Sequence, residues 1–208
     1  MRSTLLLSAL LAGAAAAAGA QEVSGKLVLY TSQPNADAQE TVDAFTAKYP
    51  EVEVEWFRDG TTKVMAKLRA EFAANNPQPD VLLIADTVTM ESLEAEGRLM
   101  AYPGADTGAY PEGLMDEQNH YFSTKLITTG IMYNTAAEMV PSSYKDLLKP
   151  AAEGLIAMPS PLTSGAATIH MATLTQNADL GWDFYEGLAE QGAIPGGGNG
   201  GTYKKVAS

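Results

Sequence analysis

The stretch from Ser160 to Ala166 (SPLTSGA) places a hydroxyl group and a glycine at the expected start of a helix. The first N–H groups of a helix have no partner within the helix, and the helix dipole favours negative charge at that end. Gly165 lets a ligand approach the backbone closely, and the Ser164 hydroxyl adds a further donor. The pattern therefore indicates a site for a small anion at Ser164, Gly165 and Ala166. Capping of the helix by Thr163 or Ser164 also explains these residues.

Further polar side chains follow expected strands, where they would face a ligand bound at the edge of a sheet. These candidate hydrogen-bond donors to a small polar solute are Ser32 and Gln33, Thr61 and Thr62, and Thr128 and Thr129. Asp86 ends the third expected strand, where its carboxylate would pair with an ammonium group or accept hydrogen bonds from sugar hydroxyls. A place in a loop, or a helix cap in the case of Asp86, is an alternative for each of them.

Asn199 lies in a glycine-rich run, Gly196 to Gly201, that satisfies the pattern G-x-G-x-x-G. This pattern is typical of dinucleotide sites when it follows the first strand of a fold and precedes an acidic residue. Here the run lies far from the first expected strand, and the acidic position falls past residue 208. We therefore do not expect a dinucleotide. The run is read either as a flexible loop or, as described below, as part of an anion site.

Catalytic groups are few in this sequence. His120 and His170 are the only histidines, there is no cysteine, and no nucleophile elbow, Walker sequence or H-E-x-x-H motif occurs. An exported hydrolase of phosphate esters would need a metal cluster or a nucleophile–base pair, which these residues do not supply. We expect a binding protein and not an enzyme. A protein-interaction module without a small ligand is a third possibility.

The elements that position the candidate residues are repeated strand–helix units. Strands are expected at Lys26–Tyr30, Val52–Phe57 and Asp80–Asp86, the last of these being the clearest buried strand. A helix with apolar residues on one face follows each strand. Three such units in succession predict an α/β fold with a parallel sheet, whose strand ends lie along one edge.

The second half of the chain has a different character. The segment Tyr102–Glu117 is predicted to be a surface excursion and Tyr121–Tyr133 an extended segment. Later expected elements are a helical segment at Tyr144–Leu148, a strand at Leu155–Met158, and helices at Ala166–Gln176 and Leu180–Gln191. We expect one lobe over residues 21–130 and part of a second over 131–208. The second lobe is expected to be incomplete, since residues 204–208 resemble the first turn of a new helix.

The first twenty residues and the charge bear on where the protein works. Residues 1–20 have the basic start, apolar run and Ala18-Gly19-Ala20 end of a cleaved secretory signal. Without cysteine, neither a lipid anchor at that signal nor a disulfide is possible, so we expect a soluble exported protein. The net charge of −12 disfavours nucleic acid as a partner.

The order of segments resembles the solute-binding proteins of ABC importers, in the branch that binds ferric ion, phosphonates and phosphorylated sugars. The stretches that carry the resemblance are LVLYTSQPNADAQETVDAFTAKYP, FRDGTTKVMAKLRAEFAANNPQPDVLLIADTVTMESLEAEGRLMAY, TKLITTGIMYN, YKDLLKP and MPSPLTSGAATIHMATL. The resemblance implies a type II periplasmic-binding-protein-like fold: two Rossmann-like lobes joined by a hinge, with the solute between them. The first crossing would be Thr128–Tyr133 and the return crossing would lie beyond Ser208. It also implies a monomer in a Gram-negative periplasm that delivers its solute to an inner-membrane ABC permease.

The same resemblance implies that Ser164, Gly165, Ala166 and Asn199 hold a phosphate-like anion. The expected solute is a small organic phosphate or phosphonate. Ferric ion with a synergistic anion is the alternative, as a ligand and not as a resident cofactor. Iron-binding members use a His, a Glu and a Tyr pair; here Pro34 and Ala85 stand at the His and Glu positions, and the Tyr pair would fall past Ser208.

Overall fold

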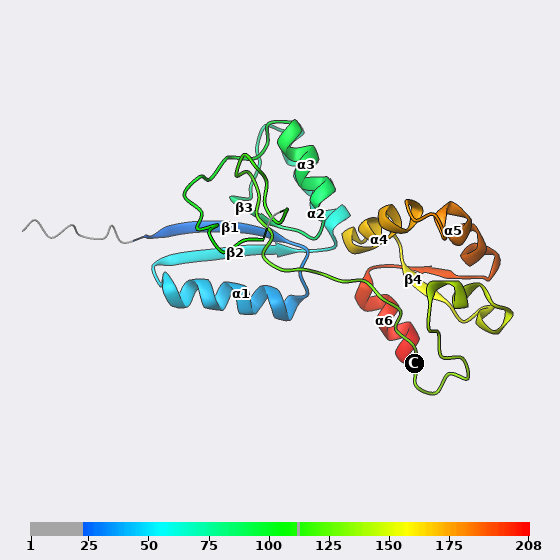
Figure 1. Cartoon of the computed structure of the whole chain (residues 1–208). Coiled ribbons are helices and arrows are strands. Elements are labelled where there is room, and N and C mark those ends of the chain that lie inside the picture. Colours follow the sequence, from blue (N-terminus) through cyan, green and yellow to red (C-terminus); the bar gives the residue numbers. More distant parts are fainter. Residues whose placement is uncertain (1–22, 112) are drawn as a thin grey trace, which may run out of the picture.

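The computed structural model describes residues 23–111 and 113–208, and the predicted signal at residues 1–20 lies outside the described residues. The described chain forms two parallel sheets, each with its own helices, placed side by side (Figure 1). The predicted α/β organisation is confirmed. Among the described helices, none combines the length and the apolar composition that a membrane span requires.

The first sheet has the strand order β2-β1-β3, and all of its pairings are parallel. Its strands are β1 (Gly25–Thr31), β2 (Val52–Arg58) and β3 (Val81–Leu83). Its helices are α1 (Asn35–Lys48), α2 (Thr61–Ala73) and α3 (Thr87–Ala95). The helices form where apolar residues recur on one face: Ala38 and Val42 of α1 are buried, as are Met65 and Leu68 of α2. These three strand–helix units match the prediction.

The prediction of a long, fully buried strand at Asp80–Asp86 is wrong in two respects. The strand β3 covers only Val81–Leu83, and Val81 is 43% exposed. The reason is that β3 pairs only with β1, at the edge of the described sheet, so its other side has no neighbouring strand there. The N–H of Ser32 donates to the carbonyl of Leu83, and the chain then turns away to begin α3.

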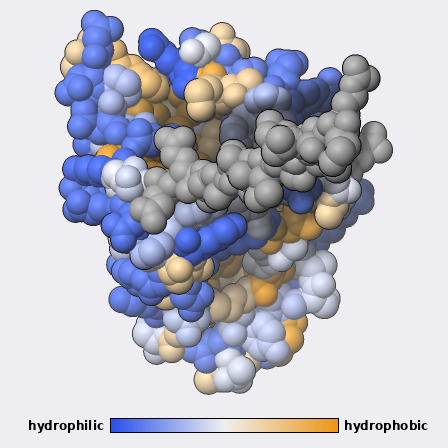
Figure 2. All heavy atoms as spheres, turned by 90° about the vertical axis from the view of Figure 1, so that its left-hand side faces the viewer, coloured by the Kyte–Doolittle hydropathy of each residue, from blue (hydrophilic) through white to orange (hydrophobic). Residues whose placement is uncertain are grey.

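Apolar side chains are buried in two separate clusters, one for each sheet. In the first, Met65 and Leu68 of α2 pack against Leu93 of α3. The second is centred on Phe184 and Leu188. Figure 2 shows the end of the molecule formed by the first sheet: hydrophilic residues cover most of it, and hydrophobic residues form separate groups between them. The two clusters therefore hold two units that each bury their own core.

The segment between the two units has little regular structure, as predicted for the surface excursion and the extended stretch. Its described part from Leu99 to Ser143 holds one antiparallel bridge, between Met115 and Phe122, and no helix or strand. Thr128 and Thr129 lie in this segment and are exposed. The predicted lobe boundary at residue 130 falls in it and stays a prediction.

The second sheet pairs β4 (Ala157–Pro159) with β5 (Ile194–Gly196) in parallel. The short 3-10 helices of this unit are η1 (Tyr144–Leu148) and η2 (Pro150–Ala152). Its α-helices are α4 (Gly165–Thr175), α5 (Gly181–Glu190) and α6 (Asn199–Ala207). Phe184 and Leu188 of α5 are buried against Ala152, Ile156 and Leu174. The first and last residues of α4 and α5 agree with the predicted ranges to within one residue.

Two expectations for this unit need correction. The strand predicted at Leu155–Met158 begins two residues later, because Leu155 is 75% exposed and only Ala157–Pro159 pairs with β5. The glycine-rich run is not a flexible loop: Gly196 ends β5 and Asn199 begins α6. The sequence predicted that the last helix starts at about Lys204, and the structure starts it five residues earlier, at Asn199.

Candidate functional site

Four of the described helices begin where the two units meet. In the first unit α2 follows β2 and α3 follows β3; in the second α4 follows β4 and α6 follows β5. Figure 1 shows α4 beside α2 and α3, with α6 beneath α4. Because the strands are parallel, their carboxyl ends and the helix starts gather on one edge of each sheet. These edges face one another, so unpaired helix N–H groups converge between the units.

The closest approach between the units is at Gly165, the first residue of α4. A side-chain carbon added there would lie 2.7 Å from the Thr61 hydroxyl and 2.8 Å from Asp86 Oδ2. Gly60, just before α2, lies equally close to the second unit: a side-chain carbon added there would clash with the backbone carbonyl of Thr163. Glycine at these two positions therefore allows the starts of α2, α3 and α4 to meet.

Ser164 has the capping role that was considered for it from the sequence, and it also contacts Asn199. Its hydroxyl oxygen caps α4 by accepting a hydrogen bond from the N–H of Ala167, at 3.2 Å. The same hydroxyl donates to Oδ1 of Asn199 at 2.9 Å. The neighbouring Thr163 hydroxyl donates to the carbonyl of Gly197 at 2.8 Å. The starts of α4 and α6 thus form one connected structure.

Asp86 is the N-cap of α3, the alternative role considered for it. Its Oδ1 accepts a hydrogen bond from the N–H of Thr89 at 2.7 Å, and the residue is buried. Its second oxygen, Oδ2, faces Gly165 across the boundary between the units. One oxygen therefore holds the helix start, while the other is directed to the space between the units.

The Thr61 hydroxyl is an exception to the usual pairing of buried polar groups. Thr61 is 4% exposed, and its Oγ1 has no hydrogen-bond partner among the described residues. Buried hydroxyl groups are nearly always hydrogen-bonded, so a lone one calls for an explanation. Here it lies at the start of α2 and lines a pocket of about 320 Å³.

This pocket contains four of the predicted residues, namely Thr61, Thr62, Asp86 and Gly165. Sequence reasoning missed Arg69, whose guanidinium also lines the pocket and pairs with Glu96 at 3.2 Å. The spacing of four residues from Thr61 to Met65 to Arg69 puts all three on one face of α2, and this signal was readable in the sequence.

The other predicted residues lie outside the pocket. The N–H of Gln33 donates to Thr31 Oγ1 and its carbonyl accepts from Arg58, so Gln33 and the adjacent Ser32 form a connected loop elsewhere on the sheet edge. Thr128 and Thr129 are exposed in the extended segment. Ala166 and Asn199 are next to the site through α4 and the Ser164 hydrogen bond, without lining the pocket.

Comparison with known proteins assigns the family. The family model described as bacterial extracellular solute-binding protein matches residues 27–207. The chain belongs to this family. The resemblance predicted from the sequence is therefore confirmed. An uncharacterised protein of Haemophilus influenzae is 30% identical to this solute-binding protein over 180 residues, which cover 81% of this chain and 51% of the relative.

Solved structures have the same fold. The periplasmic binding protein P5PA aligns with a TM-score of 0.67 and 23% identity over 89% of this chain and 62% of its own. The periplasmic binding protein AfuA of Actinobacillus pleuropneumoniae, solved with fructose-6-phosphate bound, gives 0.64 and 27% over 80% and 55%. Iron-bound HitA of Pseudomonas aeruginosa gives 0.67 and 22% over 87% and 59%. The predicted periplasmic-binding-protein fold is confirmed, and this chain spans just over half the length of these relatives.

The two positions that iron-binding members would use do not offer metal ligands in this solute-binding protein. Pro34 is exposed just before α1, and Ala85 precedes the cap of α3. Asp86 is the one carboxylate among the described residues that line the pocket, and no histidine or tyrosine lines it. The donor set there is built mainly from hydroxyl groups, backbone N–H groups and one guanidinium.

Proposed function

We propose that the protein captures a small organic phosphate or phosphonate outside the cytoplasm and presents it to an ABC permease of the inner membrane. The observation that carries the proposal is the buried Thr61 hydroxyl, which has no partner among the described residues and lies where the starts of α2, α3 and α4 meet. Unpaired helix N–H groups and a lone donor together favour an oxyanion. Export through a cleaved signal and delivery to a permease are part of this proposal.

The chemistry of the pocket favours an anion that also carries polar groups. Arg69 and the helix starts favour a phosphoryl or phosphonyl oxygen, whereas the carboxylate of Asp86 would repel it. Oδ2 of Asp86 is instead suited to an ammonium group or to sugar hydroxyls. A sugar phosphate or an aminophosphonate meets both demands, and inorganic phosphate meets only the first. The fructose-6-phosphate bound to AfuA, which is 27% identical, is in agreement with this class of solute.

Ferric ion is the less favoured cargo. Fe³⁺ requires several oxygen or imidazole ligands, and the described pocket offers it one carboxylate next to a guanidinium. The proposal for iron would gain if other parts of the protein supplied tyrosine ligands.

Isothermal titration of the full-length protein tests the proposal. We expect fructose 6-phosphate or 2-aminoethylphosphonate to bind with measurable heat and to raise Tm, and fructose and ethanolamine to do neither. Inorganic phosphate should bind more weakly than the organic compounds. Absence of heat and of a Tm shift with every phosphorylated compound would contradict the proposal. Binding of Fe³⁺ with a visible charge-transfer band would favour iron, and release of inorganic phosphate from an ester would favour a hydrolase.

A further inference from the structure

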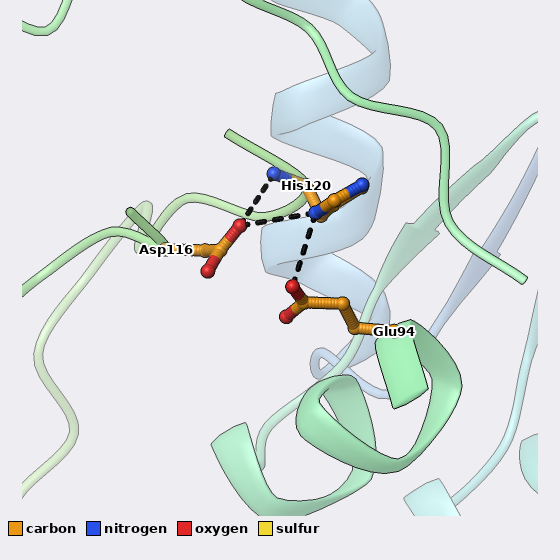
Figure 3. A group of neighbouring side chains, drawn as sticks. All are labelled: Glu94, Asp116 and His120. Carbon is orange, nitrogen blue, oxygen red and sulfur yellow. Dashed lines mark hydrogen bonds and ion pairs between the residues drawn. The ribbon is translucent and has the colours of Figure 1, made fainter. Parts of the chain in front are cut away.

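A second group of ligand atoms lies away from the solute pocket, at the other end of α3. Glu94, Asp116 and His120 each offer one potential metal-ligand atom, and these atoms all lie within 4.8 Å of one another. Glu94 is in the last turn of α3, whereas Asp86 caps the first turn. None of the three residues lines the pocket; Ser92 of α3 does, and Glu94, two residues further on, is turned by about 200° to another face of the helix. Asp116 and His120 come from the irregular segment that follows α3 (Figure 3).

A single ring nitrogen faces both carboxylates. His120 Nδ1 lies 3.2 Å from Oε1 of Glu94 and 3.2 Å from Oδ2 of Asp116. Figure 3 shows the two carboxylates reaching this nitrogen from different elements. One N–H group points along one direction, so it makes a good hydrogen bond to only one of the two oxygens. The three ligand atoms therefore surround a common point and do not form a single hydrogen-bonded pair.

The charge of the group is not balanced by neighbouring basic residues. The side chains of Glu94 and Asp116 are 16% and 10% exposed, and within the described chain neither pairs with a lysine or an arginine. Glu94 and Asp116 thus place two partly buried carboxylates close together, and like charges at this distance disfavour each other. A cation between them would remove this repulsion, and it would have both an imidazole nitrogen and carboxylate oxygens as ligands.

The carboxylate of Asp116 is already held in place by the backbone. Its Oδ2 accepts hydrogen bonds from the N–H of Gln118 at 3.0 Å and from the N–H of His120 at 2.9 Å. Its Oδ1 and Oε2 of Glu94 have no hydrogen bond within the described residues. These two oxygens are therefore free to bind a metal ion within the described chain, whereas His120 Nδ1 would exchange its contacts with the two carboxylates for the ion. Asp116 would lose little freedom on binding, because its backbone hydrogen bonds would remain.

We propose that Glu94, Asp116 and His120 form a binding site for one divalent transition-metal ion, of which Zn²⁺ is the representative. One imidazole and two carboxylates are ligands that Zn²⁺ accepts, and three protein ligands leave a position for water. The bound ion would fasten the segment around Asp116 and His120 to the end of α3. The site takes no part in holding the solute, so the proposal does not depend on the proposed function.

Titration of untagged, chelator-treated full-length protein with ZnSO₄ tests this site, without any solute present. We expect one equivalent of Zn²⁺ to bind and to raise Tm. His120→Gln and Glu94→Gln should each lower the affinity at least about tenfold, because even substitutions beyond the ligands cost that much. Glu96→Gln is the matched control: it removes the same charge from the same end of α3, where Glu96 pairs with Arg69 instead. Asp86→Asn controls for binding in the pocket, and both controls should keep the wild-type affinity.

Failure of the wild-type protein to bind Zn²⁺ at millimolar concentration would overturn the proposal. Zn²⁺ affinity that survives His120→Gln but is lost in Asp86→Asn would also overturn it, by placing the ion in the pocket. Should a ligand variant fail to fold, the imidazole ¹⁵N resonances of the wild-type protein replace it. A shift of Nδ1 of His120 on adding one equivalent of Zn²⁺ supports the site, and an unchanged Nδ1 resonance refutes it.

Discussion

Gly165 at the start of α4 packs directly against Thr61 at the start of α2, leaving no room for a side chain between them. A carbon attached to Gly165 would lie 2.7 Å from the Thr61 hydroxyl. This contact joins the two units at the edge where their helix starts converge. It also places a buried hydroxyl without a partner beside the least hindered backbone of α4.

Substitution of Gly165 by alanine should therefore weaken both the contact between the units and solute binding. Alanine normally stabilises a helix relative to glycine by up to about 1 kcal/mol, so a loss would reflect the clash and not helix propensity. Gly200→Ala is the matched control, because Gly200 lies in α6 with open space around its Cα. Thermal unfolding and titration with the organic phosphate measure both effects. Equal behaviour of the two variants would show that the Gly165 contact is unimportant.

Removal of the Ser164 hydroxyl should affect stability and binding together. Ser164→Ala loses the cap of α4, typically about 0.5–2 kcal/mol of the free energy of unfolding, and the hydrogen bond to Asn199 that orients the start of α6. Thr31→Val removes a hydroxyl hydrogen bond from the first sheet, outside the pocket. Both variants should unfold at lower urea concentration, but only Ser164→Ala should raise the Kd for the solute. A Kd raised equally in both would point to a general loss of stability.

Two buried threonines should respond in opposite ways to replacement by valine. The Thr31 hydroxyl donates to the carbonyl of Leu83 at 2.9 Å, and its loss should cost about 1 kcal/mol or more of the free energy of unfolding. The Thr61 hydroxyl has no partner, so Thr61→Val in the solute-free protein should be neutral or stabilising. Urea unfolding of the two variants measures this difference. Destabilisation of the solute-free protein by Thr61→Val would mean that the hydroxyl already has a partner.

Acid should weaken the second unit through Asp146. A hydrogen bond from the Lys149 ammonium, followed by those from Ser142, holds the pKa of Asp146 well below its ordinary value of 3.8. As the pH falls below 3.8, Asp146 becomes protonated in the unfolded chain but stays ionised in the folded chain. Its contribution to the free energy of unfolding is therefore present above pH 3.8 and is lost as the pH falls further. Asp146→Asn should flatten the pH dependence of Tm in this range. Asp179→Asn should leave it unchanged, because Asp179 is exposed and lies 3.8 Å from Lys145.

The parts of the fold that the sequence predicts are those fixed by local patterns. Helices α1 and α2 follow from apolar residues at helical spacing, and β1 and β2 from short apolar or alternating runs. The length of β3 was overestimated because an apolar run does not reveal that one side of the strand has no neighbour. Strand β5 was missed because its three residues include Pro195 and Gly196, and its partner β4 lies far away in sequence.

The candidate site was predicted in the same uneven way. Thr61, Asp86 and Gly165 line one pocket because each stands where a strand gives way to a helix, and strand order places such junctions together. Arg69 was missed because its role depends on which face of α2 is turned to the second unit. Thr128 and Gln33 were placed near the site by order along the chain, and the path of the loops puts them elsewhere.

The most direct test of the central claim is a comparison of Kd values for the organic phosphate. These are measured by isothermal titration for the wild-type protein, Thr61→Val and Thr202→Val. Thr202 is the matched control, since it too has a buried hydroxyl without a partner in the described chain but does not line the pocket. A hydrogen bond to a charged group contributes about 1.5–3 kcal/mol, so Thr61→Val should raise the Kd roughly 10-fold to 150-fold. Thr202→Val should leave it unchanged. Equal affinity of Thr61→Val and the wild-type protein would contradict the claim that the solute is bound at the meeting point of the helix starts.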